Sequence, residues 1–268
     1  MSASPLSNGA RLLAWARRAS GELERKRAEI NELNVFPVPD GDTGSNMAHT
    51  MAAAVEAASE LPEGAGLTEV AEALAVGAVR GARGNSGVVL SQILRGFAQA
   101  ADNGATEGEM LAVALTNAVG FVDRAIAKPV EGTIITVLRA AADATRPNAH
   151  LPLHDVAAAA TAAAQDALRL TQTQLPALRE AGVVDAGGAG LGAVLGTLTG
   201  EGEGEGEPED VDRQMPETHG TQGELEVMFS FRGDLDALKG ELAGLGDSLI
   251  IAPLNDAEAT VHLSLIHI

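Results

Sequence analysis

The chain contains no cysteine and no tyrosine, and its 268 residues include only five phenylalanines and one tryptophan. Without cysteine it can form neither a disulfide scaffold nor a thiolate zinc site, and it has no thiol nucleophile. With so few aromatic side chains, the core must be built from alanine, valine, leucine and isoleucine. This composition favours tightly packed helices over an aromatic-rich β-sandwich.

Basic residues are also scarce, because 18 lysines and arginines face 37 aspartates and glutamates and leave a net charge of −19. A surface of this sign repels nucleic acids and anionic membranes, so we expect no nucleic-acid partner. An anionic substrate would need a local cation or metal to offset the field. The sequence also lacks an apolar run long enough for a signal peptide or a membrane span, which predicts a cytoplasmic protein.

Residues 1–200 predict helices joined by glycine-rich turns. Ser4 followed by Pro5 predicts a helix start, because a serine cap and a proline at the first helical position are typical of one. Thr106 and Glu109 have the spacing of a capping box, and the alanine-rich residues 155–170 have high helix propensity throughout. We therefore expect this part of the chain to form a helical domain.

Beyond residue 200 the composition changes. Residues 201–218 predict a flexible acidic linker, because glycine alternates with glutamate over 201–207 and like charges repel one another. Residues 219–268 predict a fragment of an α+β domain. A half-buried strand is expected over 225–231, where apolar and polar residues alternate, and Asp234 is expected to cap a short helix after it.

The most informative segment is 34–47, in which two prolines exclude a helix over 37–39 and two glycines permit tight turns. Asp40 and Asp42 are two residues apart on this loop, so both carboxylates can point at one hard cation such as Mg²⁺. A lone Asp-Gly-Asp turn would be explained by helix capping, but the whole segment is not. The residues that then open a helix, with N–H groups free for phosphate oxygens, are Thr43, Gly44 and Asn46.

Three further clusters of glycine and small polar residues lie at 81–87, 129–133 and 182–190. In the first, Asn85 and Ser86 are candidates for phosphate or ribose contacts, with the neighbouring Arg83 as a counter-charge. Taken alone, this cluster is better explained as a helix–helix turn with glycines for close approach. In the last cluster Asp185 could meet a metal or a base edge, or simply cap a helix.

Together these four segments resemble the nucleotide-binding (DhaL-like) domain of the dihydroxyacetone kinase superfamily, and more closely the A subunit of bacterial fatty acid kinases. The resemblance covers residues 30–195, and its first motif is highly specific. It implies an antiparallel helical barrel that holds ATP and Mg²⁺ in loops at one end. The expected fold class is therefore an all-α N-terminal domain of this kind, followed by the α+β fragment.

The resemblance also assigns roles to individual residues. Asp40 and Asp42 become the Mg²⁺ ligands, with Asn34 as a third candidate. The sugar-kinase branch has an aspartate before this core where the present chain has Asn34, which fits the fatty acid kinase branch instead. The implied nucleotide contacts are Thr43, Gly44 and Asn46 at the phosphates, Asn85 and Ser86 over the nucleotide, Thr133 at its flank, and Asp185 with Gly187 at the adenosine side.

Among the six histidines, only His262 is a candidate catalytic residue. It falls in a predicted strand, and the resembling family has a histidine-bearing strand there that matters for phosphotransfer. His49 is better explained as a partly exposed helix residue than as a general base. His150 and His154 lie on either side of a proline and are not expected to form a metal pair.

These assignments predict an ATP-dependent kinase subunit that phosphorylates a fatty acid carboxylate presented by a separate lipid-binding (DegV-like) carrier protein, giving an acyl phosphate. A kinase subunit for a dihydroxyacetone-type polyol stays open as an alternative, as does a nucleotide-binding regulatory module without catalysis. The sequence is compatible with a homodimer and indicates no membrane span.

A separate expectation concerns the last six residues of the chain. Residues 263–268 match the in-frame translation of a common transposon-end sequencing adapter. We therefore expect these residues not to be native and the protein to be longer, with acceptor-side residues in the missing part. A genuine short apolar tail that completes a strand is the alternative.

Overall fold

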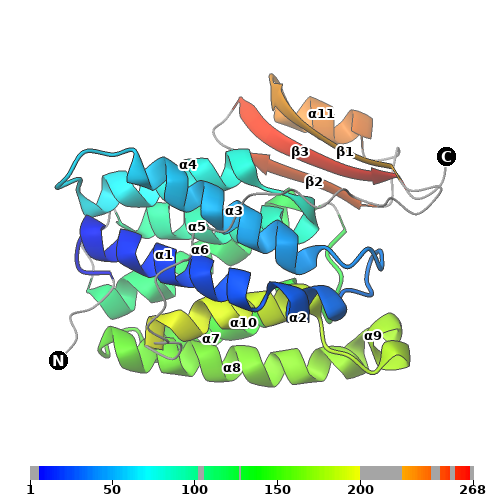
Figure 1. The fold of residues 1–268 in the computed structure, drawn as a ribbon, viewed down its shortest axis with the longest axis horizontal. Helices are drawn as coiled ribbons and strands as arrows, with labels where there is room; N and C mark the ends of the chain where they lie inside the picture. Colours follow the sequence, from blue (N-terminus) through cyan, green and yellow to red (C-terminus); the bar gives the residue numbers. More distant parts are fainter. Residues whose placement is uncertain are drawn as a thin grey trace.

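The computed structural model describes residues 6–101, 106–126, 128–199, 225–242, 248–253 and 257–265. Helices occupy the chain up to residue 199, and a three-stranded sheet with one helix follows (Figure 1). This arrangement confirms the expected fold class. The predicted linker over 201–218 lies outside the described residues.

The helices of the first part follow one another closely along the chain. Their bounds are α1 Gly9–Arg25, α2 Arg27–Glu32, α3 Thr43–Ser59, α4 Leu67–Gly81, α5 Gly84–Ala101, α6 Glu107–Ala125, α7 Ile134–Thr145, a 3₁₀ turn Arg146–Asn148, α8 Leu153–Gln174, α9 Pro176–Ala181 and α10 Ala186–Thr199. From α3 to α8 each long helix packs against the next one in sequence, α10 packs against both α8 and α1, and α1 packs against α3. The contacts therefore close into a ring, as a helical barrel requires.

Local sequence sets the ends of several helices. The capping box of α6 is confirmed, because the Glu109 carboxylate accepts from the Thr106 N–H at 2.9 Å and the Thr106 hydroxyl accepts from the Glu109 N–H at 3.4 Å. Ser4 and Pro5, where a helix start is expected, lie outside the described residues. Residues 6–8 are turn and bend, and α1 begins at Gly9, where the Asn8 side chain accepts from the N–H of Arg11 at 3.0 Å. Asparagine is among the strongest N-caps, which explains why α1 begins at Gly9.

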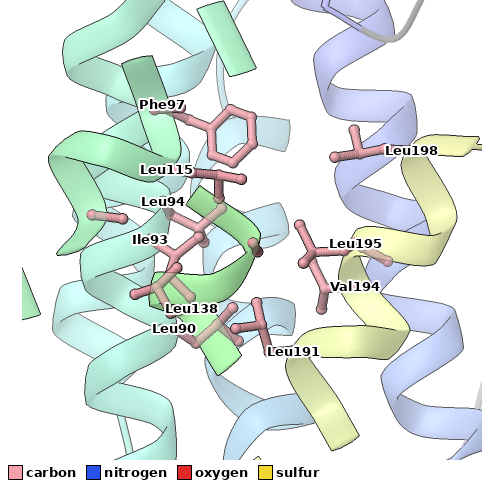
Figure 2. Packing of buried hydrophobic residues seen from close by; sticks show 14 of the residues in the cluster. Leu90, Ile93, Leu94, Phe97, Leu115, Leu138, Leu191, Val194, Leu195 and Leu198 are labelled. Carbon is pink, nitrogen blue, oxygen red and sulfur yellow. The ribbon is translucent and has the colours of Figure 1, made fainter. Parts of the chain in front are cut away.

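The interior of the helical part is filled by aliphatic side chains, as the composition predicts. Side chains of α5 and α10 face each other across the core in Figure 2, with Leu115 and Leu138 beside them. The ring of the single tryptophan, Trp15, is tilted by 36° against that of Phe97, with the ring centroids 5.3 Å apart. Its Nε1–H donates to the Thr197 hydroxyl at 3.0 Å. The labelled residues of the two helices are Leu90, Ile93, Leu94 and Phe97 on α5 and Leu191, Val194, Leu195 and Leu198 on α10.

The second part consists of β1 Leu225–Arg232, α11 Leu235–Leu242, β2 Ser248–Pro253 and β3 Glu258–Leu265. The strands are antiparallel in the order β1-β3-β2, and His262 of β3 is paired with Met228 and Ile250. As predicted, Asp234 caps α11 by accepting from two backbone N–H groups at 3.0 Å. One face of the sheet packs on α11 through buried aliphatic residues such as Ile251 and Val261.

The opposite face of the sheet rests on the helical part near the junction of α4 and α5. Ile250 and Ala252 pack with buried residues of that junction and of α6, and Ile250 forms a β-bridge to Ile126. The Thr260 hydroxyl donates to the carbonyl of Val79 at 2.9 Å. The sheet is therefore joined to the helices by apolar and polar contacts, at the end where the glycine-rich loops lie.

Candidate functional site

A cavity of about 180 Å³ opens among the loops at one end of the helical part. Its walls come from the loop before α3, the first turn of α5, the loop between α6 and α7, the start of α10, and β2. The four motif segments and β2, which lie far apart in sequence, thus converge on one site. The expected site residues in the lining are Asn34, Asp40, Asp42, Thr43, Asn46, Asn85, Ser86, Thr133, Asp185 and Gly187; Gly44 and His262 are absent from it.

Asn34 braces the loop that carries the two aspartates. It is only 7% exposed, and its amide nitrogen donates to the carbonyl of Val38 at 2.6 Å. Its amide oxygen accepts from the backbone N–H of Thr43 at 3.0 Å and also from the Thr43 hydroxyl. One side chain therefore ties both ends of the loop together and sets where Asp40 and Asp42 lie. Direct ligation of a cation by Asn34 stays a prediction.

The N–H groups expected to be free at the start of α3 are partly in use, which corrects the sequence prediction. Thr43 donates its N–H to Asn34, and Ser45 donates its N–H to Asn31 Oδ1 at 3.1 Å. The Asn31 amide donates in turn to the Ser45 hydroxyl at 3.0 Å. Asn31 was not identified from the sequence as part of the site. Its spacing of three residues from Asn34, which is typical of one helical face, is the pattern that could have indicated it.

Gly44 has a packing role where the sequence predicted a phosphate contact. It is buried outside the cavity lining, and a Cβ atom there would lie 2.4 Å from the carbonyl oxygen of Arg27. Real Cβ contacts are not this short, so glycine is needed for α2 to lie against α3. The residue thus helps to place the aspartate loop without facing the cavity.

Asp40 is exposed and Asp42 is half-buried, and both line the cavity. Two carboxylates on one loop match the way Mg²⁺ is held, because this ion takes one or two carboxylates and completes its shell with phosphate oxygens and water. Among the described residues, no group of three or more histidines, aspartates or glutamates could hold a metal ion. The residues present therefore suit a cation that arrives with a phosphate ligand.

The glycines of the second cluster serve close packing, and the same packing puts polar residues at the cavity. Gly84 has φ +56°, and a Cβ atom there would lie 2.4 Å from the amide nitrogen of Asn46. The first turn of α5 therefore lies directly against α3. Asn85 and Ser86 follow Gly84 and reach the cavity lining. Arg83, expected as a counter-charge, is exposed and lies outside the lining.

Asp185 is a buried carboxylate at the far wall. It is 6% exposed, and its Oδ2 accepts from the N–H of Gly188 at 2.7 Å, so it caps α10. Burial raises its pKa to about 6, while hydrogen bonds from the backbone of Gly188 and Ile134 oppose the rise. Thr133 caps α7 in the same way, by accepting from the N–H of Ile135 at 3.4 Å. Both residues combine a capping role with a place in the cavity wall.

The described histidines differ in exposure. His49, His150 and His154 are exposed. His262 is 1% exposed, and its Nδ1 lies 2.9 Å from Oδ1 of Asn85. Asn85 lines the cavity and His262 does not, so His262 contacts the lining at Asn85, and its catalytic role stays a prediction.

Two contributions to the cavity were not anticipated. Lys128 is its only basic lining residue among those described, and it directly precedes the 129–133 segment. Leu249 and Ile250 of β2 form part of the wall. The site is therefore not confined to the helical part, although the sequence suggested a self-contained binding domain. Separate domains at 1–200 and 219–268 remain a proposal.

Comparisons with known proteins find similar sequences and a similar fold. A profile of the DAK2 domain family matches residues 37–200. Protein YloV of Bacillus subtilis is 41% identical over 190 residues, which are 67% of this chain and 34% of YloV. The uncharacterized protein SSP1546 of Staphylococcus saprophyticus is 35% identical over 254 residues, covering 85% of this chain and 45% of the relative. The chain thus spans only a third to just under half the length of such relatives.

Among solved structures, the dihydroxyacetone kinase from C. freundii in complex with AMP-PNP and Mg²⁺ is similar, with a TM-score of 0.53 and 24% identity over 71% of this chain and 34% of the kinase. At this level of identity the likeness concerns the fold. Within the described residues, no helix combines the length and the apolar character needed to cross a membrane.

Proposed function

The chain belongs to the DAK2 domain family, and on this premise we propose that it is the ATP-binding part of a kinase. One observation carries the proposal: four motif segments, spread from Asn34 to Gly187, line a single cavity that contains two carboxylates on one loop. The similar dihydroxyacetone kinase was solved with AMP-PNP and Mg²⁺. A nucleotide with its cation is the ligand that these residue types suit best.

Within this proposal, different residues contact different parts of the nucleotide. Asp40 and Asp42 would hold Mg²⁺, which would supply the positive charge that neutralises the phosphates of the nucleotide. Asn46 and Asn85, which both line the cavity, contact the phosphates, and Thr43 and Ser86 lie beside them. Thr133, Asp185 and Gly187 form the adenosine side. The protein contributes mainly position and charge, since phosphoryl transfer needs little covalent work from the enzyme.

Lys128 is proposed as the counter-charge for the phosphates. Removing a hydrogen bond to a charged group costs about 1.5–3 kcal/mol, so Lys128→Ala should weaken Mg·AMP-PNP binding about tenfold or more, as measured by calorimetry. Arg83→Ala is the matched control, because Arg83 is an exposed cation outside the lining. Equal losses in the two variants would point to a general field effect and remove Lys128 from the site.

The acceptor is proposed to be a fatty acid carboxylate presented by a DegV-like lipid-binding carrier. Support comes from the resemblance of residues 34–47 to the fatty acid kinase branch, including Asn34 in place of an aspartate. A carboxylate oxygen would attack the γ-phosphorus of ATP while the bond to the bridging oxygen breaks. ADP leaves, and the acyl phosphate stays with the carrier.

The experiment that tests this function uses protein expressed from the complete gene, with Mg·ATP, oleate and a purified DegV-like carrier. ADP release and hydroxylamine-trapped acyl phosphate are measured with and without the carrier, and dihydroxyacetone is supplied in a parallel reaction. Acyl phosphate that forms only with the carrier supports the proposal. Dihydroxyacetone phosphate would instead establish a polyol kinase. Nucleotide binding without turnover in every reaction would establish a regulatory module.

A further inference from the structure

One polar contact between the sheet and the cavity wall joins residues 177 positions apart. His262 of β3 is almost fully buried, and its Nδ1 lies 2.9 Å from Oδ1 of Asn85 in the first turn of α5. An amide oxygen only accepts hydrogen bonds, so Nδ1 of His262 carries the proton and donates it. The contact therefore fixes the tautomer of the histidine and the orientation of the amide together.

We propose that His262 is a positioning residue, which orients the Asn85 amide so that Asn85 can hold a phosphate group of the nucleotide. A side-chain amide has one accepting and one donating end, and rotation about its last bond exchanges them. Phosphate oxygens only accept, so Asn85 can serve them only through its nitrogen. With the oxygen turned toward His262, the nitrogen is the end that a phosphate oxygen can use.

The sheet holds the histidine firmly enough for this role. His262 lies on the central strand β3, paired on one side with Met228 and on the other with Ile250. Ile250 itself packs against the α4–α5 junction, and Thr260, two residues before His262, donates to the carbonyl of Val79 in α4. Strand β3 thus holds the Nδ1–H donor next to Asn85, because the strand is paired on both sides and fixed to the helices beside His262.

This inference rests on the proposed nucleotide-binding function, and a double-mutant cycle tests it. Mg·AMP-PNP affinity is measured by calorimetry for the 268-residue chain and for its Asn85→Ala, His262→Ala and doubly substituted variants. We expect each single substitution to weaken binding about tenfold, and the double variant to bind no more weakly than Asn85→Ala, because the histidine acts only through that amide. His262→Asn keeps a donor near the position of Nδ1 and should recover most of the loss.

Thr260→Val is the matched control, since it removes the other hydrogen bond between β3 and the helices without touching Asn85. It should bind within about twofold of the parent, and the melting temperature of each variant shows whether the sheet stays folded. If His262→Ala does not fold, the comparison of His262→Asn with Thr260→Val decides. Equal losses in the two, multiplying losses in the double variant, or no loss in His262→Ala would each overturn the positioning role. A parent chain that binds no nucleotide would overturn the proposed function itself.

Discussion

Replacing Asp40 or Asp42 by alanine is expected to lower the affinity for Mg·AMP-PNP about a hundredfold or more. The two side chains are the only carboxylates on the loop that lines the cavity beside Thr43 and Asn46. Without one of them the cation loses a charged ligand, and the phosphates face an acidic protein with less neutralisation. A hundredfold loss corresponds to about 2.7 kcal/mol, which calorimetry resolves readily.

The control for this prediction is Asp166→Ala, which removes an exposed acid on α8 that does not line the cavity. Its affinity should equal that of the parent, and the helical circular dichroism of all three variants should be unchanged because neither aspartate is buried. Affinity for AMP-PNP in EDTA should be equally weak in the parent and the variants. Unchanged Mg·AMP-PNP affinity in both aspartate variants would contradict the assignment of the cation site.

Asp185→Asn is expected to make the ligand-free protein more stable at pH 7, by up to about 3 kcal/mol. Burial raises the pKa of Asp185 from 3.8 to about 6 in the folded state, and a pKa difference of one between folded and unfolded states corresponds to about 1.4 kcal/mol. Between pH 3.8 and about pH 6, Asp185 is therefore protonated in the folded state and ionised in the unfolded state. The contribution of Asp185 to the free energy of unfolding is fully present below about pH 4 and is lost as the pH rises through about 6.

Asparagine removes the titration but keeps an oxygen that can cap α10, and it is itself a strong N-cap. The free energy of unfolding in urea is compared for parent and variant at pH 4 and pH 7. We expect a small difference at pH 4 and a large gain for the variant at pH 7. Asp155→Asn, an exposed acid in the first turn of α8, supplies the reference for ordinary acids. Parallel pH dependence in parent and Asp185→Asn would contradict the effect of burial.

Sequence patterns predicted those structural elements that depend on residues close together in the chain. The capping box at Thr106, the cap at Asp234 and the alanine-rich helix α8 depend on neighbours within a few residues, and each was found. The gathering of four separate loops at one cavity was predicted by resemblance to a family, since no local pattern reports which loops meet.

The missed features depend on contacts between distant segments. Gly44 is required by the carbonyl of Arg27 in the preceding helix, and Asn31 reaches Ser45 across the same gap. Lys128 becomes part of the site only because its loop folds toward the cavity. The contribution of β2 to the wall depends on how the sheet docks, which no pattern within residues 225–265 reports.

The central claim, that these loops form one Mg·nucleotide site, is tested most directly by a crystal structure of the chain grown with AMP-PNP and Mn²⁺ in place of Mg²⁺. Anomalous scattering locates the manganese ion without reference to any assumed ligand. The account predicts one anomalous peak within coordinating distance of both Asp40 and Asp42, with the phosphates against Asn46 and Asn85. A nucleotide bound elsewhere, or a metal held by other residues, would contradict it.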